Sequence, residues 1–165
     1  QLRSGDIMGE TSIETPWGAE SREREARLYV LDWKTQKVKN SFVPIQGARE
    51  IAQIFVDQFD RAHCLTDQSI YFVCDPSTEQ VLFQTDLSNW GQIVRNGFAY
   101  DVTTNKLFCL LSETLLRIEI QEKRCVEPQV IHALPMSASS GLVLKNDRIY
   151  YGSGSHLCSI QTSEN

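Results

Sequence analysis

Short apolar runs return along the chain at a nearly constant spacing. One set begins at residues 28, 70, 115 and 157, so neighbouring runs start 42 to 45 residues apart. A second set lies just ahead of three of them, at residues 64–65, 108–110 and 150–151. The runs are rich in Leu, Ile, Val, Tyr and Phe, which suit a pleated, packed surface. The pattern therefore predicts short β-strands organised as a repeat.

A polar motif of the form D-x-x-T-x-x, followed by Val or Leu, separates several of these strands. It occurs at residues 32–38, 75–81 and 101–107. An Asp that closes a strand can accept hydrogen bonds from backbone N–H groups of the next turn, and the Thr hydroxyl does so more weakly. We therefore expect each motif to form a hairpin turn and not a metal site.

A period of about 40–45 residues with several short strands per repeat is typical of a β-propeller blade. The prediction is an all-β, propeller-like single domain over residues 1–165, either a small ring or part of a larger propeller. Open strand edges would then favour pairing with another chain, including a second copy. The repeats are predicted at approximately 1–45, 46–90, 91–132 and 133–165.

Individual strands are clearest in the last two repeats. The first repeat has no obvious inner strand, and the fourth stops before an outer one. The predicted strands of the third repeat are 97–100, 106–111, 114–120 and 125–131, and those of the fourth are 141–144, 148–152 and 156–160.

Residues 48–62 do not follow the strand pattern. Their apolar positions fall at i, i+3, i+4 and i+7, without Gly or Pro, which favours an amphipathic helix of about four turns. The register of the repeat instead favours a strand near residues 51–56. Both alternatives remain open at this point.

Two groups of propellers resemble this sequence. Residues 95–101 with 105–109 resemble the N-G-x-A-x-D…LY segment of the gluconolactonase/regucalcin group and of NHL-type repeats. Residues 140–157 and 27–38 are similar to quinoprotein-type blades. The lactonase resemblance implies a divalent cation such as Ca²⁺, with Glu14 and Asn96 as ligands, and a metal-dependent hydrolase as one function. The quinoprotein resemblance implies a quinone-dependent dehydrogenase, which would need a larger ring.

Composition narrows the class of protein. The net charge is -5 and the pI is about 5.2, which argues against a nucleic-acid partner. No apolar run approaches the roughly 20 residues of a membrane span. The five cysteines mostly lie within apolar runs and form no C-x-x-C motif, so we expect buried, reduced thiols and a cytoplasmic location.

No nucleophile–base or phosphate-loop motif stands out, so the catalytic residues are unknown from the sequence. We therefore expect a non-catalytic module that binds a protein or a small molecule through loops around residues 10–25 and 88–97. The metal-dependent hydrolase is the alternative. The expected binding residues are Trp17, Arg22, Arg24, Trp90 and Asn96.

Overall fold

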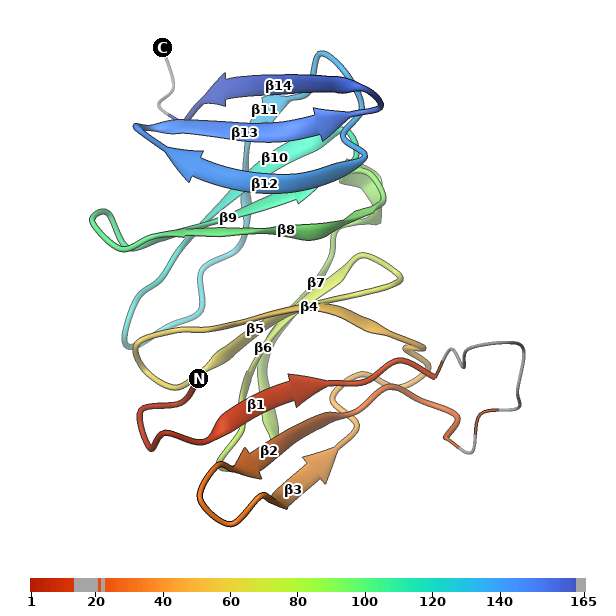
Figure 1. Ribbon diagram of the computed structural model, residues 1–165, viewed down its shortest axis with the longest axis vertical. Coiled ribbons are helices and arrows are strands. Elements are labelled where there is room, and N and C mark those ends of the chain that lie inside the picture. The colour runs from red at the N-terminus through yellow and green to blue at the C-terminus, as the bar shows by residue number, and fades with distance from the viewer. Residues whose placement is uncertain (14–20, 22, 163–165) are drawn as a thin grey trace. The chain divides into compact units, whose positions relative to one another are not determined.

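A computed structural model describes residues 1–13, 21 and 23–162 of the chain (Figure 1). These residues form four antiparallel β-sheets and no α-helix, which confirms the all-β prediction. The chain divides into two compact units, residues 1–86 and 87–165, which are described separately. In each sheet, strands that are consecutive in the sequence are neighbours and run antiparallel.

The first unit contains a three-stranded and a four-stranded sheet (Figure 1). The three-stranded sheet has the order β1-β2-β3, and the four-stranded sheet has the order β4-β5-β6-β7. The bounds are β1 Ile7–Glu10, β2 Leu28–Asp32, β3 Lys37–Phe42, β4 Ile51–Val56, β5 Ala62–Thr66, β6 Ile70–Asp75 and β7 Gln80–Asp86.

The second unit begins with a short 3-10 helix, Ser88–Trp90, and again holds one four-stranded and one three-stranded sheet. The fourth predicted repeat is three-stranded among the described residues, as the sequence indicated. The bounds are β8 Ile93–Asp101, β9 Lys106–Leu111, β10 Thr114–Glu119, β11 Gln129–Ala133, β12 Ser140–Lys145, β13 Arg148–Ser153 and β14 His156–Gln161.

The predicted strand at 125–131 is displaced toward the C-terminus. Strand β11 begins at Gln129, directly after Pro128. Proline has no backbone N–H to donate to a sheet, so it is found at the start of a strand more readily than inside one. The pairing with β10 therefore begins after this residue.

The helix alternative for residues 48–62 is wrong. Residues Ile51–Val56 form strand β4, which pairs with β5. The Oδ1 atom of Asp57 accepts hydrogen bonds from the backbone N–H groups of Phe59 at 2.8 Å and Arg61 at 3.0 Å, and Asp60 has a positive φ of 62°. This turn reverses the chain, and pairing with β5 outweighs the local helical periodicity.

The D-x-x-T motifs form hairpin turns, as predicted. The Oδ1 atoms of Asp32, Asp75 and Asp101 each accept a hydrogen bond from the backbone N–H two residues on, at 2.8, 2.8 and 2.9 Å. The fifth residue of each motif, which leads into the returning strand, has a positive φ. These residues are Gln36 at 57°, Glu79 at 60° and Asn105 at 57°.

Each unit has its own apolar core between its two sheets. In the first unit Leu28 and Phe42 of one sheet pack with Cys64 and Phe72 of the other. The second unit has the equivalent arrangement, where Phe108 and Leu115 pack with Ile149 and Tyr151. Burying a side chain of this size contributes roughly 1.5–3 kcal/mol, so these cores hold each pair of sheets together.

Candidate functional site

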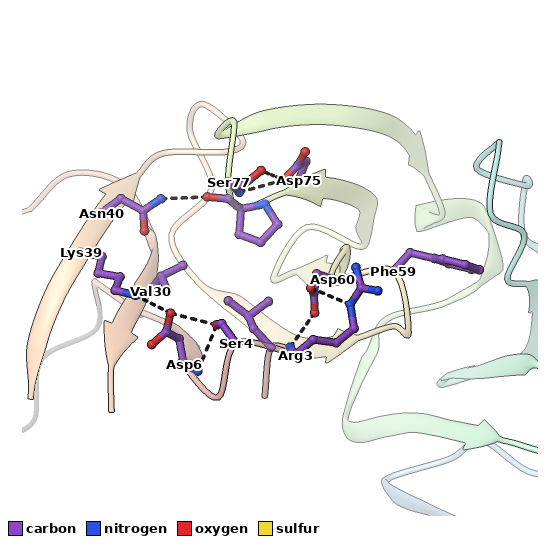
Figure 2. Close-up of a pocket in the computed structure, with 12 residues that line it drawn as sticks. Arg3, Ser4, Asp6, Val30, Lys39, Asn40, Phe59, Asp60, Asp75 and Ser77 are labelled. Atoms are coloured by element: carbon purple, nitrogen blue, oxygen red, sulfur yellow. Dashed lines mark hydrogen bonds and ion pairs between the residues drawn. The ribbon is translucent and has the colours of Figure 1, made fainter. Parts of the chain in front are cut away.

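A cavity of about 550 Å³ lies in the first unit, where the N-terminal segment meets strands β2 and β3 and the turns after β4 and β6 (Figure 2). Its wall mixes apolar side chains with paired charges and neutral polar groups. The lining residues are Leu2, Arg3, Ser4, Asp6, Val30, Lys39, Asn40, Phe59, Asp60, Asp75, Pro76 and Ser77.

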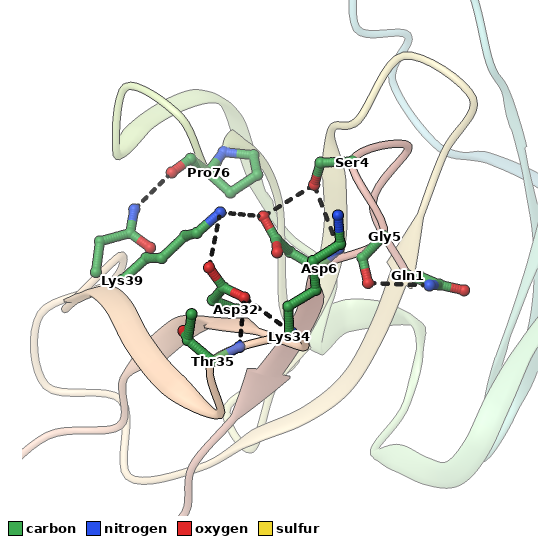
Figure 3. Close-up of polar contacts among 10 residues, drawn as sticks. Gln1, Ser4, Gly5, Asp6, Asp32, Lys34, Thr35, Lys39 and Pro76 are labelled. Atoms are coloured by element: carbon green, nitrogen blue, oxygen red, sulfur yellow. Dashed lines mark hydrogen bonds and ion pairs between the residues drawn. The ribbon is translucent and has the colours of Figure 1, made fainter.

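Lys39 on β3 forms the first ion pair of the cavity. Its Nζ lies 2.6 Å from Oδ2 of Asp6 and 3.8 Å from Oδ2 of Asp32 (Figure 3). The Ser4 hydroxyl also donates to Oδ2 of Asp6, at 2.9 Å. A smaller hollow of about 280 Å³, which includes Trp33, shares Ser4, Asp6 and Lys39 with the cavity. The cluster thus lines both hollows.

These contacts move the pKa values of the cluster away from neutrality. The hydrogen bonds from Lys39 and then Ser4 lower the pKa of Asp6. The hydrogen bond to Asp6 raises the pKa of Lys39. The backbone N–H of Thr35 is the main cause of the lowered pKa of Asp32. At Asp75, burial acts in the opposite direction, but the hydrogen bonds from Ser77 and Thr78 outweigh it and lower the pKa.

A second ion pair ties the N-terminal segment to the turn after β4. The Nε atom of Arg3 lies 2.9 Å from Oδ2 of Asp60, and the backbone N–H of Arg3 donates to Oδ1 of Asp60 at 2.8 Å (Figure 2). Because the Arg3 side chain is 71% exposed, this pair contributes at most about 1 kcal/mol to stability. Its structural effect is to place the N-terminal segment beside the cavity.

Asn40 connects the two sheets at the cavity wall. Its Nδ2 donates to the carbonyl oxygen of Pro76 at 2.8 Å. Its Oδ1 is shielded from solvent and has no hydrogen-bond partner among the described residues. An unsatisfied buried acceptor costs about 1–3 kcal/mol. The hydrogen bond from Nδ2 of Asn40 to Pro76 is therefore made at the expense of the unpaired Oδ1 atom.

A buried polar network holds the turn that carries Phe59 and Asp60. Oδ2 of Asp57 lies 2.7 Å from Nη2 of Arg61 and 3.1 Å from Nε2 of His63, and Nδ1 of His63 lies 2.6 Å from the hydroxyl oxygen of Tyr71. The Arg61 guanidinium also lies 5.0 Å from the centre of the Phe59 ring. These contacts hold the turn in place, and the turn supplies Phe59 and Asp60 to one wall of the cavity.

Asp57 is ionised within this network. Burial acts to raise its pKa, but the hydrogen bonds from His63, Arg61 and Phe59 outweigh burial and lower the pKa to about 2. An ionised carboxylate can only accept hydrogen bonds, so in a neutral His63 the ring proton lies on Nε2, which donates it in a hydrogen bond to Asp57. Nδ1 is then the acceptor for the Tyr71 hydroxyl, an assignment inferred from the hydrogen-bond pattern.

The residues predicted from the sequence do not line this cavity where they are described. Glu14, Trp17 and Arg22 lie outside the described residues. Arg24 is exposed in the first unit, and Trp90, which is 42% exposed, ends the 3-10 helix of the second unit.

Asn96 is an exposed residue on β8 with a φ of 57°, at an irregular point in the pairing with β9. Its carbonyl oxygen closely faces Gly141 on β12, where an added Cβ would lie 2.2 Å from it. The absence of a Cβ at Gly141 therefore lets β8 and β12 approach at Asn96. The predicted role of Asn96 as a metal ligand stays a prediction.

Sequence reasoning missed Lys39 and Asn40, although the repeat contained a signal for them. Seven and eight residues after the Asp of the D-x-x-T motif, the second repeat has Leu82 and Phe83. Lys39 and Asn40 occupy these positions in the first repeat. A polar pair where the second repeat is apolar marks a departure from pure packing.

Among the described residues, no group of three or more His, Cys, Asp or Glu side chains is arranged to hold a metal ion. A scan against models of protein families finds no match, and a search of curated proteins finds no significant relative. The described part of the chain also has no helix with the length and apolarity needed to cross a membrane.

Proposed function

We propose that this chain is a non-catalytic binding module, and that its ligand occupies the cavity between the N-terminal segment, β2–β3 and the turns after β4 and β6. The proposal keeps the function expected from the sequence and moves the site. The rim loops around residues 10–25 and 88–97 are replaced by a cavity whose lining residues come from both sheets of the first unit.

The observation that carries this proposal is the pairing of charges at the cavity, where Nζ of Lys39 lies 2.6 Å from Oδ2 of Asp6 and Nε of Arg3 lies 2.9 Å from Oδ2 of Asp60. The directions of the pKa shifts support it. A general acid or base works best with a pKa near the working pH, so catalytic sites usually move carboxylate pKa values upward and amine pKa values downward. Here the pKa values of Asp6, Asp32 and Asp75 are lowered and that of Lys39 is raised. The groups therefore keep their charges at neutral pH, which suits hydrogen bonding to a ligand.

The pairing of charges favours a small neutral polar ligand. Lys39 and Arg3 are already neutralised by Asp6 and Asp60, so an anion would have to compete with a carboxylate that is in place. A hydroxyl group can both donate to a carboxylate and accept from an ammonium or guanidinium group. The apolar parts of the wall, including Val30 and Pro76, suit the carbon skeleton of such a molecule.

We also infer that the four sheets are blades of a propeller-like repeat. The consecutive strand order in every sheet and the equivalent D-x-x-T turns after β2 and β6 support this. We also keep the proposals that the chain binds a protein partner and that copies of the chain pair through their strand edges. The free state of all five cysteines supports a reducing, intracellular setting.

Titration by two-dimensional ¹H–¹⁵N NMR tests the site. Myo-inositol and D-glucose serve as neutral polyols, and inorganic phosphate serves as the anion. We expect the polyols to shift the amide signals of Ser4, Lys39 and Ser77, and phosphate to shift them less. Lys39→Ala should abolish the response, and Lys37→Ala, on the same strand but outside the cavity, should preserve it.

The proposal is wrong if neither polyol shifts these signals at concentrations up to about 50 mM, which already corresponds to very weak binding. A Ca²⁺ titration addresses the alternative of a metal-dependent hydrolase. Saturable Ca²⁺ shifts centred on Asn96, lost in Asn96→Ala, would favour that alternative.

A further inference from the structure

The three-stranded sheet of the second unit exposes one face on which apolar side chains lie beside the polar residues Lys145, Arg148 and Ser159. Val143, Tyr150 and Ser159 are paired across β12, β13 and β14, and Leu157 lies two residues from Ser159 on the same side. Val143 is 61% exposed and Leu157 is 79% exposed. The opposite side carries Ile149 and Tyr151, which are buried in the core of the unit. We call the exposed side the β12–β14 face.

Comparison with the preceding repeat shows which residues are equivalent to those of the β12–β14 face. Strands β9 and β10 begin at residues 106 and 114, and β13 and β14 begin at 148 and 156, so an offset of 42 residues superimposes both hairpins. Tyr150 and Leu157 are then equivalent to Phe108 and Leu115. Those two residues are buried, and they are the ones that pack against the next sheet of the second unit.

The three-stranded sheet of the first unit has a second, partly exposed face with apolar side chains, on which Tyr29 and Leu31 are half-buried. Its β2 residues Tyr29 and Leu31 lie on the side opposite the buried Leu28 and Val30, and Leu31 is paired with Val38, which is 57% exposed. We call this side the β1–β3 face.

An offset of 43 residues, set by the D-x-x-T motifs at Asp32 and Asp75, makes this face equivalent to a buried one. Tyr29, Leu31 and Val38 correspond to Phe72, Cys74 and Val81. Phe72 and Cys74 are fully buried, and all three pack against the preceding sheet within the first unit.

We propose that the β12–β14 face of one copy of this chain packs against the β1–β3 face of a second copy. By its position in the repeat, the β12–β14 face corresponds to the side by which a sheet packs against the following sheet. The β1–β3 face corresponds to the side by which a sheet packs against the preceding sheet. The two are therefore matched to each other and not to themselves, so the contact is head-to-tail.

The size of the faces sets the expected strength. Strands of four to six residues are about 13 to 20 Å long, and three of them span about 10 Å, which is smaller than a standard stable interface. We therefore expect a weak association, with a dissociation constant in the range of roughly 10 μM to 1 mM. The most exposed apolar side chain of each face, Leu157 or Val38, should dominate it, although both residues lie on edge strands.

Sedimentation equilibrium between about 10 μM and about 1 mM tests this proposal on the chain as it stands. The unmodified chain should show a mass that rises with concentration. Leu157→Asp and Val38→Asp should each remain monomeric. Val102→Asp is the matched control, because Val102 is also 79% exposed but lies in the turn between β8 and β9. It should associate like the unmodified chain.

Mixing the two monomeric variants distinguishes the head-to-tail contact from other modes. Leu157→Asp retains an intact β1–β3 face and Val38→Asp an intact β12–β14 face, so an equimolar mixture should form a dimer and nothing larger. A chain that stays monomeric throughout the range overturns the proposal. It is also overturned if only one of the two substitutions blocks association, since that marks a symmetric contact, or if Val102→Asp blocks it equally. Far-ultraviolet circular dichroism confirms that each variant is folded.

Discussion

Nζ of Lys39 and Oδ2 of Asp6 lie 2.6 Å apart and join strand β3 to the segment that leads into β1. These residues are 33 positions apart in the sequence, and both line the cavity and the adjoining hollow. The pair places a charged donor and a charged acceptor side by side at the point where the proposed ligand would lie.

Replacing Lys39 with Met should raise the pKa of Asp6 toward its ordinary value. The hydrogen bond from Lys39 is the largest cause of the lowered pKa, and Met has a similar length without the charge. A ¹³C NMR titration of the Asp6 carboxyl group measures the change. Lys37→Met, on the same strand but not in contact with Asp6, should leave the titration unaltered. An unchanged Asp6 pKa in Lys39→Met would contradict the assigned role.

Asp57 should make the stability of the first unit depend on acid pH. Its pKa is about 2 in the folded chain, against an ordinary value of 3.8. A lowered folded-state pKa stabilises the fold at pH values above the unfolded pKa. This stabilisation, about 2 kcal/mol, is lost as the pH falls from about 4 toward 2. Urea unfolding across this range measures it.

The Asp57→Asn variant tests the same network at neutral pH. It leaves the buried Arg61 without its carboxylate partner, which should cost about 3 kcal/mol or more. It should also remove the acid-pH dependence attributed to Asp57. Asp147→Asn, at an exposed turn position where Asn is well tolerated, is the control and should change the free energy of unfolding by less than about 0.5 kcal/mol. Equal losses in the two variants would count against the network.

Gly141→Ala should destabilise the second unit by about 1–3 kcal/mol. The new methyl group would lie 2.2 Å from the carbonyl oxygen of Asn96, so β8 and β12 would have to separate. Gly154→Ala is the matched control, since nothing lies within 4 Å of its added methyl group. Its positive φ of 54° should cost only about 1 kcal/mol. Denaturant unfolding compares them, and a smaller loss for Gly141→Ala would refute the close approach.

Glu79→Gly should stabilise the first unit by about 0.5–1 kcal/mol. Glu79 has a φ of 60° and an exposed side chain, and glycine adopts this backbone conformation without strain. Gln80→Gly, one residue later at the start of β7, should instead destabilise the unit, because glycine weakens a strand. Thermal unfolding gives both signs. A loss of stability in Glu79→Gly would mean that the side chain matters more than the turn.

Much of the secondary structure could be predicted because its causes are local. The Asp of each D-x-x-T motif bonds to the backbone only two residues away, and this short contact sets the hairpin wherever the motif occurs. The apolar runs could be placed as strands for the same reason. Residues 48–62 are the exception, since the helical spacing of their apolar side chains was overridden by pairing with β5.

The sequence by itself thus determined the all-β class, the period of the repeat and the position of most strands. Only the tertiary structure decided where the cavity lies, because its ion pairs join residues 33 and 57 positions apart. It also decided which side of each repeated strand is covered. A strand of fixed sequence pattern presents two faces, and whether a face is buried depends on the sheet beside it, which no local pattern encodes.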